Sequence, residues 1–143
     1  MEYKHLGKSG LKVSPLCLGT MLFGRETPSQ ESQLIIESAR SSGINFIDTA
    51  DAYVGGDSER LVGRCIKTSR DHWVLATKLA NKMGQGPNKG GLSRKWVMQA
   101  CEESLRRLRT DYIDIYYLHK EDHATPLRET IMAMGDLIKD GKI

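Results

Sequence analysis

The chain has 143 residues, of which 39% are hydrophobic and 27% charged, with a formal net charge of +3. This size gives room for about one domain, and the composition is that of a globular protein rather than a disordered or fibrous one. The positive charge is small and spread along the chain among acidic residues. It therefore predicts no nucleic-acid partner, although it would tolerate a polyanionic cofactor.

Neither a membrane segment nor a secretion signal is visible in the sequence. No apolar run approaches the ~18 residues that span a bilayer, and the first ten residues hold no apolar stretch of the kind found in signal peptides. The three cysteines, Cys17, Cys65 and Cys101, are far apart and lie in apolar surroundings. They predict reduced core residues rather than disulfides, and hence a cytoplasmic protein with no membrane partner.

Short apolar runs alternate with amphipathic stretches along the chain. The N-terminal residues predict a small hairpin, with strands over 2–6 and 11–14 on either side of a glycine-containing turn. Four later runs predict buried strands, at 16–19, 44–47, 73–76 and 112–118. Four amphipathic stretches predict helices, at about 28–42, 58–68, 94–108 and 126–140.

Residues at the expected helix ends carry their own signals. Thr27 and Thr125, each followed by proline, and Ser93 predict N-caps, with Gln30 completing a capping box in the first helix. Gly43 predicts a left-handed end to that helix. One face of the first helix, and the apolar stripe of the last, are expected to be buried: Leu34, Ile35, Ser38 and Ala39; Leu127, Ile131, Met134 and Ile138.

The strict alternation of strands and helices predicts a parallel sheet with right-handed crossovers. The stretch 81–91, dense in Gly, Asn and Lys, predicts a long loop. An open, flavodoxin-like sheet could be complete with four strands, whereas a (β/α)8 barrel typically takes ~250 residues. Residues 141–143 look like a helix terminator followed by the start of another strand. We therefore expect this chain to be one segment of a longer polypeptide if the barrel is correct.

Three successive predicted strands lead to residues capable of acid–base chemistry. Asp48 follows the second strand, Lys78 the third and His119 the fourth, while Tyr53 completes a D-x4-Y spacing with Asp48. Because functional residues of parallel α/β folds lie past the carboxyl ends of the strands, we expect these four at one rim. Each residue alone more often caps, packs or forms a hydrogen bond, but the four together predict a catalytic site.

The chemistry of such a set is specific. A tyrosine hydroxyl has an ordinary pKa of about 10, which is too high for an efficient acid at neutral pH. A lysine ammonium favours the phenolate, and an aspartate keeps the lysine charged and placed. A histidine beside them can orient a carbonyl oxygen. The set suits proton donation to an alkoxide, which accompanies hydride delivery to a carbonyl.

Several stretches carry a resemblance to a known family: LGKSGLKVSPLCLGTMLFG, GINFIDTADAY with GGDSERLVG, VLATK, and GGLSRKWVMQACEESLRRLRTDYIDIYYLH. Over all 143 residues the chain resembles the N-terminal half of an aldo-keto reductase. The resemblance implies that residues 1–143 are half of a single α/β domain, a (β/α)8 TIM barrel. The chain would supply the N-terminal hairpin and the first four βα units.

The resemblance also implies a catalytic tetrad of Asp48, Tyr53, Lys78 and His119. Tyr53 would be the general acid, Lys78 and Asp48 would tune it, and His119 would orient the carbonyl of a small-molecule substrate. The implied reaction is the reduction of aldehydes or ketones to alcohols. The identity of the substrate stays open, because rim loops set specificity in this fold.

A nicotinamide cofactor follows from the same resemblance. It would be NADPH, with NADH not excluded, and it would bind without a Rossmann fold. Gly19, Thr20 and Met21 match the turn after the first strand that lies by the nicotinamide, with Asp48 beside them. Its adenosine-phosphate contacts would come from the remainder of the barrel, beyond residue 143. Oligomerisation is possible.

A second function class stays open. The family includes β subunits of voltage-gated potassium channels, whose N-terminal region is similar to this chain but which commonly have asparagine at the position of His119. That histidine favours an enzyme over a regulatory module. An inactive half-barrel fragment is the third alternative. Two departures from the family, the VGGDSE turn after Tyr53 and the segment 120–122, fall near the expected substrate mouth.

Other motifs carry weaker signals. Gly7-Lys8-Ser9 lacks the upstream glycine and the preceding strand of a phosphate-binding loop. His119 and His123 have no third His or Cys at a metal-ligand spacing, so no metal site is predicted. The run Arg106, Arg107 and Arg109 near a helix end favours an interaction with the helix dipole and solvent rather than with a ligand.

Overall fold

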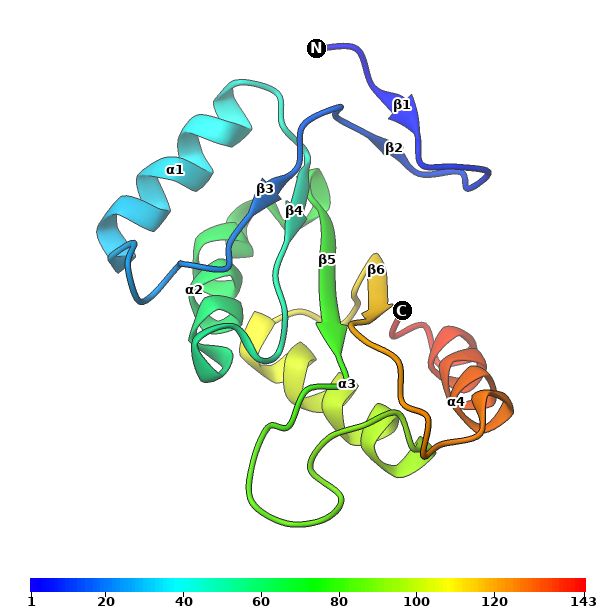
Figure 1. The fold of residues 1–143 in the computed structure, drawn as a ribbon. Coiled ribbons are helices and arrows are strands. Elements are labelled where there is room, and N and C mark those ends of the chain that lie inside the picture. The colour runs from blue at the N-terminus through cyan, green and yellow to red at the C-terminus, as the bar shows by residue number, and fades with distance from the viewer.

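A computed structural model describes residues 1–143 and contains two separate sheets (Figure 1). A short antiparallel ribbon near the N-terminus pairs β1 (Lys4–His5) with β2 (Lys12–Val13), as the hairpin prediction requires. The main sheet is parallel and consists of β3 (Leu18–Gly19), β4 (Phe46–Asp48), β5 (Val74–Leu79) and β6 (Ile115–Leu118). The helical segments are α1 (Ser29–Ser41), η1 (Tyr53–Gly56), α2 (Asp57–Ile66), η2 (Lys67–His72), α3 (Arg94–Leu108) and α4 (Leu127–Lys139).

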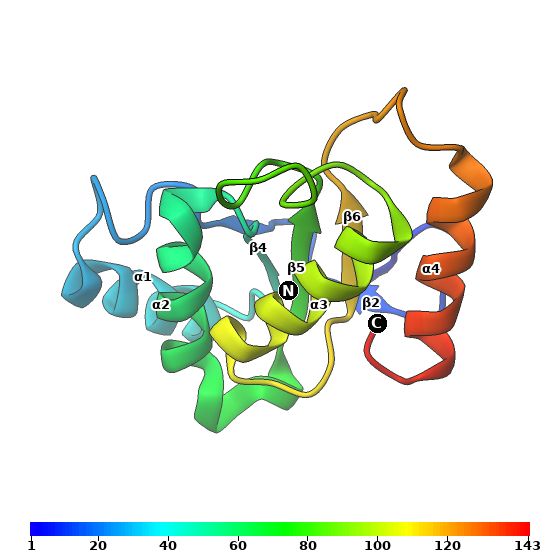
Figure 2. The ribbon, with the colours of Figure 1, turned by 90° about the horizontal axis from the view of Figure 1, so that it is seen from below.

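Every strand of the main sheet pairs with the next one in the chain. The order is β3-β4-β5-β6, with Ile47 of β4 aligned with both Leu18 and Leu75, and Ala76 with Ile115. Figure 2 shows the four α-helices in an arc around the strands. A flavodoxin-like sheet reverses its strand order at a switch point, whereas a barrel adds each strand beside the last. The sheet therefore has the topology of a barrel sector, and the flavodoxin-like alternative is wrong.

The core lies between the sheet and the helices that cover it. Its buried residues include Trp96, Val97 and Cys101 of α3 and Leu75 and Leu79 of β5. Helices α2 and α3 approach very closely: a Cβ placed at Gly63 would lie only 2.3 Å from the backbone oxygen of Leu108. Glycine is required there, since any side chain would force the two helices apart.

The helix ends match the sequence prediction in part. The Ser93 hydroxyl accepts a hydrogen bond from the Trp96 amide at 3.3 Å, and Gly43 ends α1 with φ +82°, as predicted. The caps predicted at Thr27 and Thr125 are wrong, because the prolines that follow them occupy the N-cap positions themselves. No side-chain cap is formed at either helix, so the capping box with Gln30 is also absent.

The expected apolar stripes of the outer helices are correct only in part: Ala39 is buried, and Ile35 and Met134 are half-buried against the core. Helix α4 buries Thr130, Ala133 and Leu137, while Leu127, Ile131 and Ile138 are exposed. Helix α1 likewise buries Ser32, Ile36 and Ala39 and exposes Leu34. Small and hydroxyl side chains let both helices lie close to their neighbours, and the larger apolar side chains flank the contact. Hydrophobicity alone therefore misplaced part of the buried face.

The cysteines are free and differ in burial. Cys101 is buried in the core, as predicted, whereas Cys65 is half-buried and Cys17 is exposed. Cys17 precedes β3, which has a strand neighbour on one side only, so less of the protein covers it. None of the helices has the length and apolarity needed to cross a bilayer.

Candidate active site

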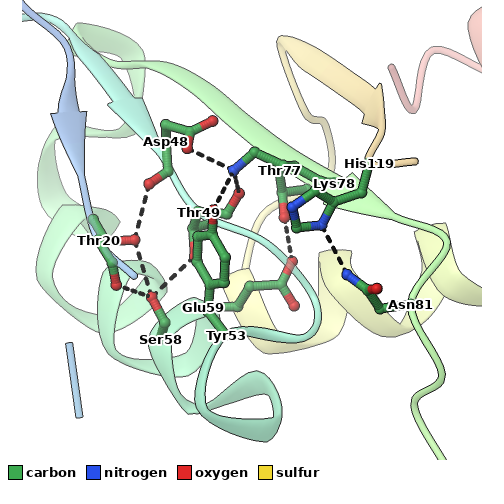
Figure 3. Close-up of polar contacts among 10 residues, drawn as sticks. All are labelled: Thr20, Asp48, Thr49, Tyr53, Ser58, Glu59, Thr77, Lys78, Asn81 and His119. Atoms are coloured by element: carbon green, nitrogen blue, oxygen red, sulfur yellow. Dashed lines mark hydrogen bonds and ion pairs between the residues drawn. The ribbon is translucent and has the colours of Figure 1, made fainter. Parts of the chain in front are cut away.

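The carboxyl ends of three neighbouring strands bring the predicted polar residues together at one rim (Figure 3). The Lys78 ammonium lies at the centre: its Nζ is 2.6 Å from Asp48 Oδ2 and 3.0 Å from the Tyr53 hydroxyl. It also donates to the backbone oxygen of Thr49 at 2.7 Å. The ammonium thus has three acceptors within the protein, and its position is fixed relative to the phenol.

Tyr53 reaches this rim because the chain turns sharply after β4. The Asp51 amide donates to the Lys78 carbonyl at 3.1 Å, which holds the turn against β5. Directly after Tyr53, Val54 adopts φ +50° and ψ +40°, a left-handed conformation that costs a β-branched residue roughly 1–3 kcal/mol. This strained residue directly follows Tyr53, whose hydroxyl accepts the hydrogen bond from Lys78.

Lys78 and Asp48 form an ion pair that is largely shielded from solvent. Their side chains are 14% and 25% exposed, respectively. Burial by itself would lower the pKa of Lys78, but the hydrogen bonds to Asp48 and Tyr53 outweigh it and raise that pKa above its ordinary value. The lysine is therefore fully charged at neutral pH, beside the phenolic oxygen.

His119 also lies beside the phenol. Its ring meets the Tyr53 ring edge-on, with centroids 5.9 Å apart and an interplanar angle of 80°. The Asn81 amide nitrogen lies 3.0 Å from His119 Nδ1; because an amide NH2 donates, Nδ1 is the acceptor. Burial, reinforced by the Lys78 charge, lowers the pKa of His119. The ring is thus neutral at pH 7 and carries its proton on Nε2, on the side facing Tyr53 (Figure 3).

A network of hydroxyl groups connects the chain segments that carry the rim residues. The Thr20 hydroxyl lies 3.0 Å from both the Asp48 backbone oxygen and the Ser58 Oγ. Ser58 lies 3.0 Å from the Thr49 hydroxyl and donates to the Thr20 carbonyl at 2.8 Å. The network ties the end of β3 to the end of β4 and to the start of α2.

The three residues expected at the cofactor differ in accessibility. Gly19 is exposed, and a Cβ built on it would meet no heavy atom within 4 Å. Met21 is 59% exposed, on the turn that follows β3. Thr20, in contrast, is fully buried and its hydroxyl is occupied within the protein. The surface at Gly19 and Met21 is thus open, whereas the Thr20 side chain serves to hold the rim together.

Asp122 connects the two loops beside the site. Its Oδ2 accepts from the Leu92 amide and from the Thr125 hydroxyl, both at 2.7 Å, and its Oδ1 accepts from the Ala124 amide at 3.0 Å. These bonds, led by the one from Leu92, lower the pKa of Asp122. The loop before α3 and the loop before α4 are therefore joined through one carboxylate.

Behind the rim lie two buried carboxylates. Glu59 accepts from the Thr77 hydroxyl at 2.6 Å and from Arg107 Nε at 2.5 Å, so its charge is paired. Asp51 is fully buried, and neither of its oxygens has a hydrogen-bond partner. Burial and the neighbouring Glu59 charge raise the pKa of Asp51 to about 7.

Sequence reasoning named the four rim residues but missed their supports: Asn81, Ser58 and Asp122. Asn81 follows Lys78 by three positions, so its closeness to the end of β5 was a usable signal. Ser58 and Asp122 gave no comparable signal, because their partners lie on segments distant in sequence. No group of three His, Cys, Asp or Glu side chains could hold a metal ion.

The sequence and the structure were compared with known proteins. Residues 15–143 match the model of the "Aldo/keto reductase family". Two curated relatives, each described as a probable voltage-gated potassium channel subunit beta, come from Arabidopsis thaliana and Oryza sativa subsp. japonica. They are 41% and 40% identical to this chain; each match covers 99% of the chain and 44% of the relative.

A solved structure is similar as well. The aldo-keto reductase AKR11C1 from Bacillus halodurans, in its holo form, has a TM-score of 0.91 and 39% sequence identity to this chain. The match covers 100% of this chain and 48% of that structure. The chain therefore spans about half the length of the proteins it matches.

Proposed function

Because the chain belongs to the aldo/keto reductase family, we propose that it supplies the acid–base residues of a site that reduces aldehyde and ketone carbonyls to alcohols. One observation carries the proposal: a single ammonium, that of Lys78, is hydrogen-bonded to both Asp48 and Tyr53. A neutral histidine ring lies beside the same phenol. A purely structural ion pair has no need of a phenol and an imidazole at this spacing.

The proposed roles follow from the hydrogen bonds. The Tyr53 hydroxyl donates its proton to the carbonyl oxygen as that oxygen gains negative charge. The Lys78 ammonium, 3.0 Å away, stabilises the phenolate that remains, and Asp48 keeps the ammonium in place. The Nε2–H of His119 donates to the same carbonyl oxygen and so orients the substrate.

We propose NADPH as the cofactor, with NADH as the alternative. Bound, it would supply the hydride that the carbonyl carbon accepts. Gly19, Met21 and Asp48 would hold its nicotinamide end, since the surface at Gly19 is open and Asp48 lies at the adjacent strand end. Thr20 would act indirectly, by fixing Asp48 through its backbone oxygen.

We propose this activity for a complete barrel, to which these residues contribute the N-terminal half. The sheet has two edges, at β3 and β6, and closing it would require further strands. The adenosine-phosphate site is assigned to those strands, and the substrate is a small carbonyl compound. With three free cysteines, the compartment we propose is the reducing cytoplasm.

The test is Tyr53→Phe in the intact protein, assayed with NADPH and a panel of aldehydes. Loss of the general acid should lower turnover on the order of 10²–10⁴-fold, while the dissociation constant of NADPH, measured by fluorescence, stays the same. Tyr112→Phe, at an exposed position on the loop before β6, is the matched control and should keep full activity. Full turnover by Tyr53→Phe would refute the assignment.

A second candidate is a regulatory subunit of a potassium channel, favoured by the descriptions of the two plant relatives. Such a subunit would bind its channel without turning over a carbonyl at an appreciable rate. A substitution at His119 distinguishes the two candidate functions. If the chain is part of a reductase, His119→Asn should slow carbonyl reduction and keep cofactor binding. A wild-type protein that binds NADPH but reduces no aldehyde in the panel would favour the regulatory role.

A further inference from the structure

The outer surface of helices α2 and α3 contains a hollow that the proposed reaction does not use. Its volume is about 460 Å³ and it has no hydrophobic lining. In Figure 2 the C-terminal end of α3 leans against α2. The lining residues, which we call the arginine hollow, are Arg60, Arg64, Glu103, Arg106, Arg107 and Arg109.

The arginine hollow gathers half of the ten arginines of a chain whose net charge is only +3. Arg60 and Arg64 are one turn apart on α2, and the others come from the last turns of α3 and its C-cap. Two of the cations converge over Gly56: a Cβ built there would lie 3.1 Å from Arg60 Nη1 and 3.1 Å from Arg107 Nε. Cations brought this close repel one another unless anions lie between them.

The protein itself supplies few of those anions. Arg107 pairs with Glu59 at 2.5 Å and lies 3.8 Å from Glu103. The other four arginines of the hollow form no ion pair at all. Elsewhere in the molecule, Arg70 and Arg94 each have an aspartate at 2.7 Å. The hollow is thus a concentration of positive charge that Glu59 and Glu103 balance only in part.

One side of the hollow is rigid. Arg107 is only 12% exposed, and its guanidinium also donates to the Ser104 hydroxyl at 3.2 Å. Its partner Glu59 is buried and bonded to Thr77 of the sheet. Arg107 is therefore held at the base. The other four arginines are exposed, and of these only Arg60 and Arg106 form hydrogen bonds, each to a backbone carbonyl.

We propose that the arginine hollow is a binding site for a small, multiply charged phosphate compound. Guanidinium groups bind phosphate oxygens in pairs through their planar forks, and arginine is the residue suited to that geometry. The volume falls in the range of roughly 300–1,000 Å³ that small-molecule sites occupy. No hydrophobic side chain lines the hollow to bind an apolar ligand. None of the rim residues lines the hollow, so this site is separate from the proposed carbonyl and nicotinamide site.

Isothermal titration calorimetry at low ionic strength tests the proposal with two probes. Tripolyphosphate represents free inorganic polyphosphate, and fructose 1,6-bisphosphate represents a phosphorylated organic molecule. We expect saturable binding of at least one probe, and the tighter one identifies the source. The double variant Arg60→Gln/Arg64→Gln should weaken that binding by about tenfold or more, since it removes two forks. Both positions are exposed, so folding, checked by circular dichroism, should be unchanged.

The matched control removes the same charge elsewhere. Arg40→Gln/Arg128→Gln changes two exposed arginines that lie outside the hollow and form no ion pair, and it should alter the affinity by less than about twofold. Equal weakening by both double variants would mean attraction to net charge only and would overturn the proposal. Absence of saturable binding by both probes would overturn it as well.

Discussion

Lys78 at the rim has a carboxylate at 2.6 Å, a carbonyl at 2.7 Å and a phenol at 3.0 Å, whereas four of the five cations in the arginine hollow have no carboxylate within 4.0 Å. A cation whose partners all come from the protein is fixed in place and suits a neutral reactant. A group of cations with few acids nearby suits an anionic ligand. The completeness of the ion pairing therefore separates the two kinds of site better than the number of charges does.

The largest effect should follow from removing the Lys78 cation, which is paired with Asp48 at the rim. Replacing Lys78 with Met removes the charge that stabilises the Tyr53 phenolate, so turnover of aldehydes should fall on the order of 10²–10⁴-fold. Steady-state kinetics with NADPH would measure this fall, and circular dichroism would show whether the fold is kept. Lys95→Met, on the exposed face of α3, is the matched control and should retain activity. If Lys78→Met unfolds the protein, the ion pair with Asp48 has a structural role instead.

The second effect is a dependence of stability on pH, and it concerns Asp51, which lies between the rim and the arginine hollow. Its amide bonds to the Lys78 carbonyl, and its carboxyl faces Glu59, Arg107 and Glu103. Because its pKa is raised to about 7, the folded protein holds a proton that the unfolded chain releases above a pH of roughly 4. The stability of the wild type therefore falls as the pH rises from there to 7, and the full cost is present above 7.

Asp51→Asn cannot ionise and should escape this cost. At pH 8 we expect it to be more stable than the wild type by on the order of 2–4 kcal/mol, with the difference shrinking as the pH approaches 4. Urea unfolding at pH 8 and pH 5 would measure the difference. Asp71→Asn, at an exposed carboxylate, should change stability equally little at both values. A pH-independent effect of Asp51→Asn would contradict the buried-proton interpretation.

The smallest expected effect is on stability. Substituting an arginine that has an ion-pair partner and one that has none should change stability in opposite directions. Arg60 and Arg64 are like charges at i,i+4 on α2, so Arg64→Gln should raise stability by about 0.3–0.5 kcal/mol at low salt. Arg94 pairs with Asp136 at 2.7 Å, so Arg94→Gln should lower stability by up to about 1 kcal/mol. Both effects should fade at high ionic strength. Thermal melts at two salt concentrations would reveal the contrast, and a destabilising Arg64→Gln would contradict it.

The rim residues were predictable because the sheet topology fixes where the strand ends lie relative to one another. Once the strands are parallel and in sequence order, Asp48, Lys78 and His119 must meet at the carboxyl edge. The arginine hollow was not predictable, since it depends on how α2 and α3 cross, and the contact at Gly63 that sets the crossing has no signature in one sequence. The run at residues 106–109 was interpreted through its own helix end, without the two arginines that α2 adds.

The capping errors have a similar origin. Thr27 and Thr125 have the right chemistry, but a proline after each already supplies the backbone angles of an N-cap. The buried faces of α1 and α4 were misjudged in part because packing distance, and not only hydrophobicity, selects the residues at the contact. Ser32 and Thr130 are fully enclosed in the protein while nearby leucines are exposed.

The carboxylate of Asp122 joins two loops that contribute different residues to one pocket. A molecule that displaces the loop before α3 must therefore also move the loop before α4, or break the 2.7 Å hydrogen bond from the Leu92 amide to Asp122. The shape of that pocket is then a joint property of both loops. Exchanging one loop alone for that of a relative would transfer its side chains without the partner residue that holds the loop in position. Exchanging both loops together would keep the Asp122 hydrogen bonds and hence the shape of the pocket.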